Sequence, residues 1–213
     1  MILAIDTALN ACSVAIVRGV EVLAHTSEAM DRGQAERITP MARDVATRAG
    51  IAFREIERIA VTTGPGSFTG VRVGLAFARG LALALKAPCV GISTLEALAL
   101  ERGASGARAG WVSTPGASYG ALYLDGDARV APQRFSSPDA GRAAFASAAP
   151  EMAIAFRGPG ADLFGGGDIF SIESVVSPDV VALAAIAALR DPQRHPPAPL
   201  YLRAPDARPA EAP

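Results

Sequence analysis

The sequence is poor in the side chains that most often perform catalysis or bind metals. Its 213 residues include only two histidines. His25 and His195 lie far apart, one near the end of a predicted strand and the other in a proline-rich tail, so they do not form the close ligand pair of a metal site. Ser67 has no histidine placed to activate it, which argues against a serine hydrolase. We therefore expect no catalytic residue and no metal ligand.

Charge is also scarce. Asp, Glu, Lys and Arg make up 19% of the chain, and the formal net charge is -1, so no strong field attracts nucleic acid or an acidic membrane. Cys12 and Cys89 lie in apolar runs and are expected to be reduced core residues of a cytoplasmic protein. A basic N-terminal region is missing, and Asp6 interrupts the first apolar stretch, so we expect no signal peptide. Arg79 breaks the longest candidate for a membrane span.

What the chain does have is apolar sequence in a regular order. Hydrophobic residues make up 50% of it, which is enough for one large domain or two small ones. In the first half, strands are predicted at 2–5, 12–17, 21–26, 59–62 and 89–92, with helices at 35–49, 71–86 and 94–100. In the second half, strands are predicted at 110–113, 119–124, 128–134, 152–156 and 172–176, with helices at 137–148 and 177–189.

The two halves share a βββαβα outline, although no identity between them is visible. This doubling predicts an α/β fold of the actin-like or sugar-kinase-like class, with two lobes facing each other. We divide the chain into an N-terminal lobe, 1–103, a smaller C-terminal lobe, 104–203, and a flexible tail, 204–213. Asp31 and Gln34 are predicted to form a capping box for the first helix, which is expected to end at Gly50.

A glycine-rich turn at 63–70 separates a buried strand from an apolar helix, with Thr69 predicted as the N-cap. Free backbone amides at a helix N-terminus attract anions. Arg72 in the first helical turn opposes the helix dipole, so a phosphate or a partner's carboxylate would be favourable there; alternatively, Arg72 points to solvent and the turn is structural. No Walker motif follows. The candidate anion or nucleotide site comprises Asp6, Thr7, Gly64, Gly66, Ser67 and Arg72.

Several stretches resemble the bacterial TsaB (YeaZ) family, once labelled glycoprotease-like. They lie at 2–7, 12–15, 34–41, 64–74 and 91–97, within the first hundred residues, and 200–206 resembles the family's C-terminus. The chain departs from the family pattern at 112–119, where acidic and basic groups are missing. We therefore expect the second lobe to support the first rather than to hold a ligand.

The resemblance implies a two-lobed actin-like fold and a non-catalytic role. Proteins of this family pair with a catalytic paralogue, TsaD, and work with the ATPase TsaE to transfer a threonylcarbamoyl group onto a tRNA adenosine beside the anticodon. It implies no cofactor, with ATP or ADP bound only weakly or within the complex, and tRNA contact through the complex. Alternatives are a nucleotide-binding ATPase or kinase of the same fold and, with less support, a protease.

The resemblance also implies that two helices of the N-terminal lobe dock on the partner, or on a second copy when the chain is alone. Both helices carry a stripe of small apolar residues, which suits close helix packing, although such a stripe can equally pack on its own sheet. The predicted contact residues are Arg37, Ile38, Met41, Val45, Val71, Gly74, Leu75 and Ala78.

Overall fold

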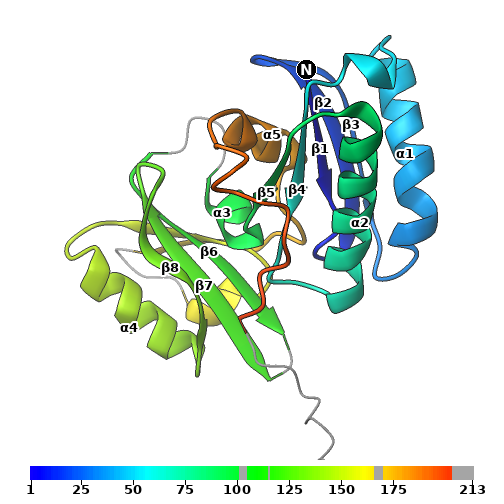
Figure 1. Cartoon of the computed structure of the whole chain (residues 1–213). Coiled ribbons are helices and arrows are strands. Elements are labelled where there is room, and N and C mark those ends of the chain that lie inside the picture. The colour runs from blue at the N-terminus through cyan, green and yellow to red at the C-terminus, as the bar shows by residue number, and fades with distance from the viewer. Residues whose placement is uncertain (101–104, 115, 166–169, 203–213) are drawn as a thin grey trace, which may run out of the picture.

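The computed structural model describes residues 1–100, 105–114, 116–165 and 170–202, which form two five-stranded sheets (Figure 1). The predicted tail, 204–213, and the predicted lobe boundary at 103 lie outside the described residues. The first sheet has the order β3-β2-β1-β4-β5 and the second has the order β8-β7-β6-β9-β10. In each sheet the first three strands are antiparallel and the last two add in parallel, so the second sheet repeats the first. The predicted doubling and the actin-like α/β class are confirmed.

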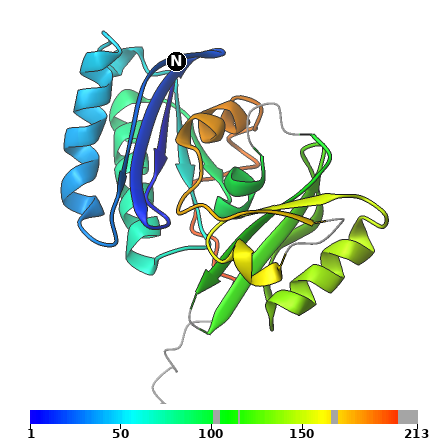
Figure 2. The ribbon, with the colours of Figure 1, turned by 180° about the vertical axis from the view of Figure 1, so that it is seen from behind.

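The elements of the first half match the predicted ones closely. Their bounds are β1 Ile2–Asp6, β2 Ala11–Arg18, β3 Glu21–Ala29, α1 Gln34–Arg48, η1 Phe53–Glu55, β4 Arg58–Thr62, α2 Phe68–Leu85, β5 Cys89–Ile92 and α3 Thr94–Ala99. β1, β2 and β4 are almost entirely buried because helices cover both faces of the sheet. α1 and α2 cover one face, while α5 covers the other (Figure 2).

The second half contains β6 Ala107–Thr114, β7 Ala117–Leu124, β8 Asp127–Phe135, α4 Pro138–Ala148, β9 Ile154–Arg157, η2 Ala161–Phe164, β10 Phe170–Glu173 and α5 Val180–Ala188. Its core is aromatic: Trp111 stacks on Phe135 and meets Phe145 and Phe164 edge-on. α4 encloses this core from outside the sheet. α3 packs on the inner face of the second sheet, against β6 and β7, and thereby joins the two halves.

α5 is the main departure from the predicted lobes, because it returns to the first sheet. It packs against β1, β2, β4 and β5, although the sequence division placed it in the second lobe. Arg58 of β4 fixes the end of the helix by donating from Nη1 to the carbonyl oxygens of Ala187 and Arg190, at 2.6 and 2.9 Å. Because α5 is apolar on all sides, its sequence does not indicate on which of the two sheets it packs.

The predicted helix starts need three corrections. α2 begins at Phe68 with Ser67 as its N-cap, not Thr69. α1 begins after Gly33, which has a left-handed backbone and no side chain to cap the helix, so the predicted Asp31 capping box is wrong. α5 begins at Val180 with Asp179 as its N-cap, three residues after the predicted start at 177. The predicted end of α1 is confirmed, because Gly50 has a φ of 66° just beyond the C-cap.

Candidate functional site

The glycine-rich turn between β4 and α2 lies directly on the turn that follows β1. A Cβ on Gly66 would stand 2.2 Å from the carbonyl oxygen of Ala8, and one on Gly70 would stand 2.2 Å from that of Thr7. The Ser67 N–H donates to Ala8 O at 2.7 Å, and Thr7 Oγ1 donates to Gly70 O at 2.7 Å. The glycines are therefore required by contact with the chain itself, and two groups expected to face an anion are engaged inside the fold.

Asp6, at the end of β1, is fully buried beneath this contact. Its Oδ1 accepts hydrogen bonds from Thr62 Oγ1 at 2.7 Å and from the Ala8 N–H at 3.1 Å. Its Oδ2 has no hydrogen-bond partner within the described part of the chain. Burial raises the pKa of Asp6 to about 6, and the bonds from Thr62 and Ala8 only partly offset this increase. A carboxyl group in this position acts within the fold, not on a ligand in solvent.

Arg72 is exposed, as in the alternative in which it points to solvent, but its guanidinium also contacts two aromatic side chains. Its guanidinium carbon lies 3.5 Å from the centroid of the Phe68 ring, which is a cation–π contact. Its Nε and Nη2 donate to the Tyr201 hydroxyl at 3.2 and 3.0 Å. The cation at the start of α2 is thus held by two aromatic residues, and no carboxylate among the described residues forms an ion pair with it. This cluster was not predicted, because Tyr201 is 129 positions away from Arg72.

The segment that carries Tyr201 crosses the first sheet at the ends of β4 and β5. The Leu200 N–H donates to Thr63 O at 2.8 Å, and the Gly91 N–H donates to His195 O at 2.9 Å. Close approach explains Gly91, because a Cβ there would lie 2.5 Å from the carbonyl oxygen of Pro196. The proline-rich end therefore covers edge strand β5 and fixes the glycine-rich turn from its other side.

Seven of the eight predicted partner contacts are buried in the chain's own core. Arg37 alone is exposed, and it forms a bidentate ion pair with Glu28. The buried seven are Ile38, Met41, Val45, Val71, Gly74, Leu75 and Ala78. The small-residue stripes of α1 and α2 thus pack on the first sheet, which was the alternative that the pattern left open.

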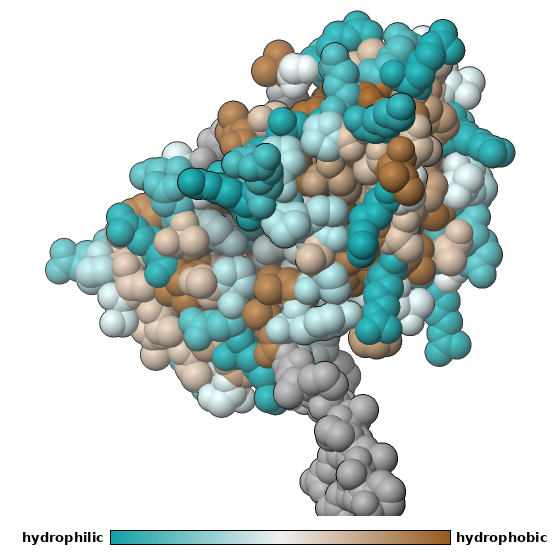
Figure 3. Space-filling view, in the orientation of Figure 1, coloured by the Kyte–Doolittle hydropathy of each residue, from teal (hydrophilic) through white to brown (hydrophobic). Residues whose placement is uncertain are grey.

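α2 nevertheless leaves a second apolar face exposed, which we call the outer α2 face. Phe68 is 63% exposed and Leu83 is 82% exposed. The face also contains exposed or half-buried Val73, Ala76, Phe77, Gly80, Leu81 and Ala84. Hydrophobic residues lie beside strongly hydrophilic ones over this part of the surface (Figure 3). Arg72, Arg79 and Lys86 are exposed, and the helix contains no acidic residue.

A cleft of about 350 Å³ lies between the two halves of the fold. The turn after β1, the glycine-rich turn, the end of β6 and the loop after β9 all contribute to it. Its lining residues are Leu9, Asn10, Gly66, Ser67, Val112, Ser113, Thr114, Pro159 and Val176.

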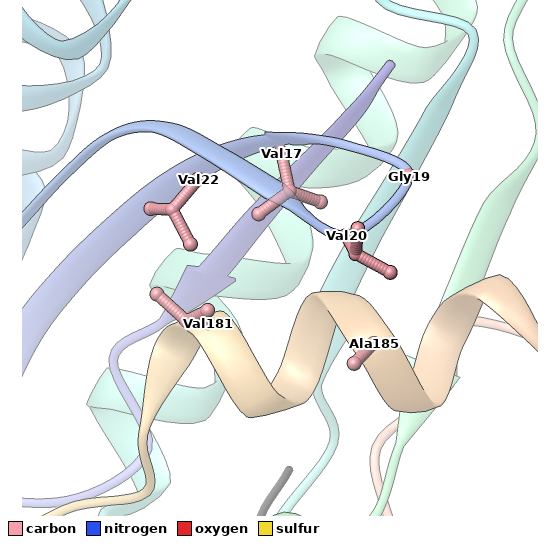
Figure 4. Close-up of a pocket in the computed structure, with 6 residues that line it drawn as sticks. All are labelled: Val17, Gly19, Val20, Val22, Val181 and Ala185. Carbon is pink, nitrogen blue, oxygen red and sulfur yellow. The ribbon is translucent and has the colours of Figure 1, made fainter.

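A smaller apolar notch of about 50 Å³ lies between the β2–β3 turn and α5 (Figure 4). Val20 at the tip of that turn is 84% exposed beside Val181 and Ala185. The notch is barely larger than one water molecule and has no polar side chain, so it is too small for an organic ligand.

No cluster of three or more potential metal ligands occurs among the residues that the structure describes. The two cysteines are free thiols, and burial raises the pKa of Cys12 to about 12 and that of Cys89 to about 11. Both therefore stay protonated and act as small apolar residues. By length and composition alone, α2 is apolar enough to cross a membrane, a test that buried helices of folded domains also pass.

Comparisons with known proteins agree with the two-lobed actin-like architecture. The family model "TsaD: tRNA N6-adenosine threonylcarbamoyltransferase" matches residues 21–117. The chain is 48% identical over 98 residues to the "tRNA threonylcarbamoyladenosine biosynthesis protein TsaB" of Escherichia coli, which is 46% of this chain and 42% of that protein. It is 32% identical over 217 residues to an uncharacterized protein of Mycobacterium tuberculosis, covering 98% and 94% of the two chains.

Among solved structures, YeaZ from Pseudomonas aeruginosa superimposes with a TM-score of 0.74 at 26% identity, covering 94% of this chain and 99% of that one. The chain belongs to the TsaB (YeaZ) family. The matched region spans less than half the length of the TsaB relatives that carry that name.

Proposed function

We propose that this chain is a non-catalytic scaffold subunit of a complex that makes N6-threonylcarbamoyladenosine in tRNA. A TsaD-type paralogue would be its direct partner and would perform the transfer, with a TsaE-type ATPase in the same assembly. The chain would meet tRNA through that complex, in the cytoplasm, and would form homodimers when alone. Support comes from the E. coli relative, which is named for this biosynthesis, and from a TsaD-type transferase of Trichlorobacter lovleyi that is 36% identical over 112 residues.

The observation that carries the proposal is the outer α2 face. Large exposed apolar side chains such as Phe68 and Leu83 share this face with small exposed residues at Ala76, Gly80 and Ala84. Small residues at a spacing of four let another helix approach closely, and exposed apolar patches on folded proteins mark interaction sites. We therefore assign docking to this face, in place of the buried stripe that the sequence indicated.

The interior of the fold supports a role without chemistry of its own. The Asp6 carboxyl is buried, and the glycine-rich turn is packed on Thr7 and Ala8. Arg72 is held by Phe68 and Tyr201. Each group that the sequence offered for nucleotide binding is thus in contact with its own chain.

Ala76→Glu tests the docking face. The added side chain prevents close helix approach and would bury a charge in the interface, so we expect affinity for the cognate TsaD-type protein to fall at least about 30-fold, or about 2 kcal/mol. Isothermal titration calorimetry of the purified pair measures this change. The matched control is Ala185→Glu, an exposed alanine on α5 that faces away from α2.

Equal affinities for both variants would overturn the assignment of the surface. Loss of binding in both, with intact circular dichroism spectra, would show that the complex uses another face. Turnover of ATP or modification of tRNA by the isolated chain at rates typical of enzymes would contradict the proposed role itself.

A further inference from the structure

Cationic side chains form a row along the outer α2 face. Arg72, Arg79 and Lys86 follow one another at intervals of seven residues, and all three are exposed. Seven residues make nearly two turns of an α-helix, so Arg72 and Arg79 project in almost the same direction, about 10 Å apart along the axis. Lys86, the C-cap of the helix, continues the row. Positive charge therefore accompanies the exposed apolar residues along the whole length of α2.

These charges are not balanced within the described part of the chain. No carboxylate there forms an ion pair with any of the three cations, and α2 itself contains no acidic residue. On the neighbouring helix α1, by contrast, Arg37 is paired with Glu28 and Arg48 with Asp44. α1 thus has two of its arginines neutralised locally, whereas α2 leaves its cations available to another molecule.

Arg72 is already oriented for such a contact. Its guanidinium carbon lies 3.5 Å from the centroid of the Phe68 ring, and its Nε and Nη2 donate to the Tyr201 hydroxyl. Nη1 forms no hydrogen bond with the described residues, so both of its N–H groups remain to donate. Because the two aromatic residues restrict the side chain, Arg72 loses less conformational entropy when it pairs with a carboxylate.

A second copy of this chain is a poor match for the row of cations. In a dimer with a two-fold axis, both copies present the same surface to each other. Two α2 helices that met in this way would contribute only positive charges to the contact. Like charges repel across an interface and thereby disfavour that pairing.

Nucleic acid is also a poor match for this surface. Protein surfaces that bind nucleic acid are more polar and much more positively charged than protein–protein interfaces, but this chain has a formal net charge of -1. Phe68 and Leu83 are large apolar side chains, exposed by 63% and 82%. Aromatic side chains and arginine are enriched in protein–protein interfaces, in which charged groups lie mostly at the rim.

We propose that the outer α2 face selects a partner protein whose facing surface is apolar and carries carboxylates, in preference to a second copy of this chain. One partner carboxylate pairs with Nη1 of Arg72, and acidic side chains about 10 Å apart meet Arg79 and Lys86. The inference rests on the proposed scaffold function, because it specifies the chemistry of the surface that covers the docking face.

Charge reversal tests the inference with the cognate TsaD-type protein as the probe. Arg79→Glu replaces an exposed cation that pairs with no described carboxylate, so the variant should fold and should bind at least about fivefold more weakly by calorimetry. Raising NaCl from about 50 to about 500 mM should weaken binding of the unchanged chain by a similar factor, because salt screens the attraction. The matched control is Arg129→Glu, an exposed arginine of β8, which should bind as the unchanged chain does.

The chain alone should show the opposite response. We expect sedimentation velocity to give a dimer fraction that rises with NaCl and rises again in Arg79→Glu, because both changes reduce repulsion between the two α2 helices. A dimer that forms equally at both salt concentrations and in both proteins would overturn the preference against a second copy.

Lys86→Glu provides a second charge reversal at an exposed position. Full affinity of both variants for the TsaD-type protein would overturn the inference. If Ala76→Glu abolishes that binding while neither charge reversal weakens it, the docking proposal stands and the inference of an acidic partner surface fails. Binding of bulk tRNA to the isolated chain that is lost in Arg79→Glu would also overturn the inference, because the cations would then serve nucleic acid.

Discussion

Replacing Asp6 by asparagine should stabilise the protein at neutral pH. The carboxyl is fully buried, and one of its oxygens lacks a hydrogen-bond partner among the described residues, so the charged form is disfavoured. Its pKa is raised from 3.8 to about 6 in the folded state. Each pKa unit corresponds to about 1.4 kcal/mol, so ionised Asp6 lowers the free energy of unfolding by about 3 kcal/mol. Asparagine keeps an oxygen for Thr62 and Ala8 without this cost.

The sign of the pH dependence follows from the same shift. Below about pH 4 both states carry the proton, so Asp6 contributes no penalty. Between about pH 4 and 6 the unfolded chain ionises while the folded chain does not, so stability falls as pH rises. Above about pH 6 both states are ionised and the penalty is constant. Stability attributed to this group is therefore greatest in acid, which is the reverse of a salt-bridged carboxylate.

Urea denaturation of both proteins at pH 4, 5, 6 and 7.5 measures the effect. We expect the difference in unfolding free energy between Asp6→Asn and the unchanged chain to grow from near zero at pH 4 to about 3 kcal/mol at pH 7.5. The difference between the two proteins cancels the contribution of the other carboxylates to the free energy of unfolding, because those groups are the same in both. A difference that does not vary with pH would refute the reasoning, as would a variant that is less stable at pH 7.5.

Three further substitutions test the contacts of α2, one of them as a control. Gly70→Ala should lower the free energy of unfolding by about 3 kcal/mol in denaturant titrations, because its Cβ would lie 2.2 Å from Thr7 O; Gly80→Ala, on the same helix with no atom within 4 Å, should instead be stabilising by about 1 kcal/mol. Equal effects at both sites would show that the close contact is relaxed in solution. Tyr201→Phe should cost about 1 kcal/mol by removing the acceptor for Arg72, and an unchanged melting temperature would show that the contact contributes nothing.

Local patterns predicted the order of elements because strands and helices here have clear apolar periods and distinct turns. The predicted β1, β2, β4 and β5 fall within one or two residues of the observed strands. The boundaries that failed depend on caps: Ser67 and Thr69 are both chemically suitable, and in the structure Ser67 is the N-cap, with its N–H bonded to Ala8 O.

The site was harder to predict because a glycine has several physical explanations that look alike in sequence. The pattern at 63–70 predicts backbone N–H groups that are free to bind an anion. In the structure the same glycines make room for the backbone of Thr7 and Ala8, and for the segment that contains Leu200. Contacts between positions so far apart leave no periodic signal. The prediction of which α2 face docks on a partner was wrong for a related reason. When a helix has apolar residues on two faces, its sequence does not indicate which of them packs on its own sheet.

These contacts make α2 a fixed element, which matters for docking. The helix is held at its start by Thr7 through Gly70 O, by Ala8 through the Ser67 N–H, and by Tyr201 through Arg72. A surface that is already rigid loses less conformational entropy when a partner binds, so affinity improves without additional contacts. On this argument Gly70→Ala should weaken binding of the proposed TsaD-type partner although position 70 is buried in the chain itself. Retained affinity in a destabilised Gly70→Ala protein would show that the outer face alone determines binding.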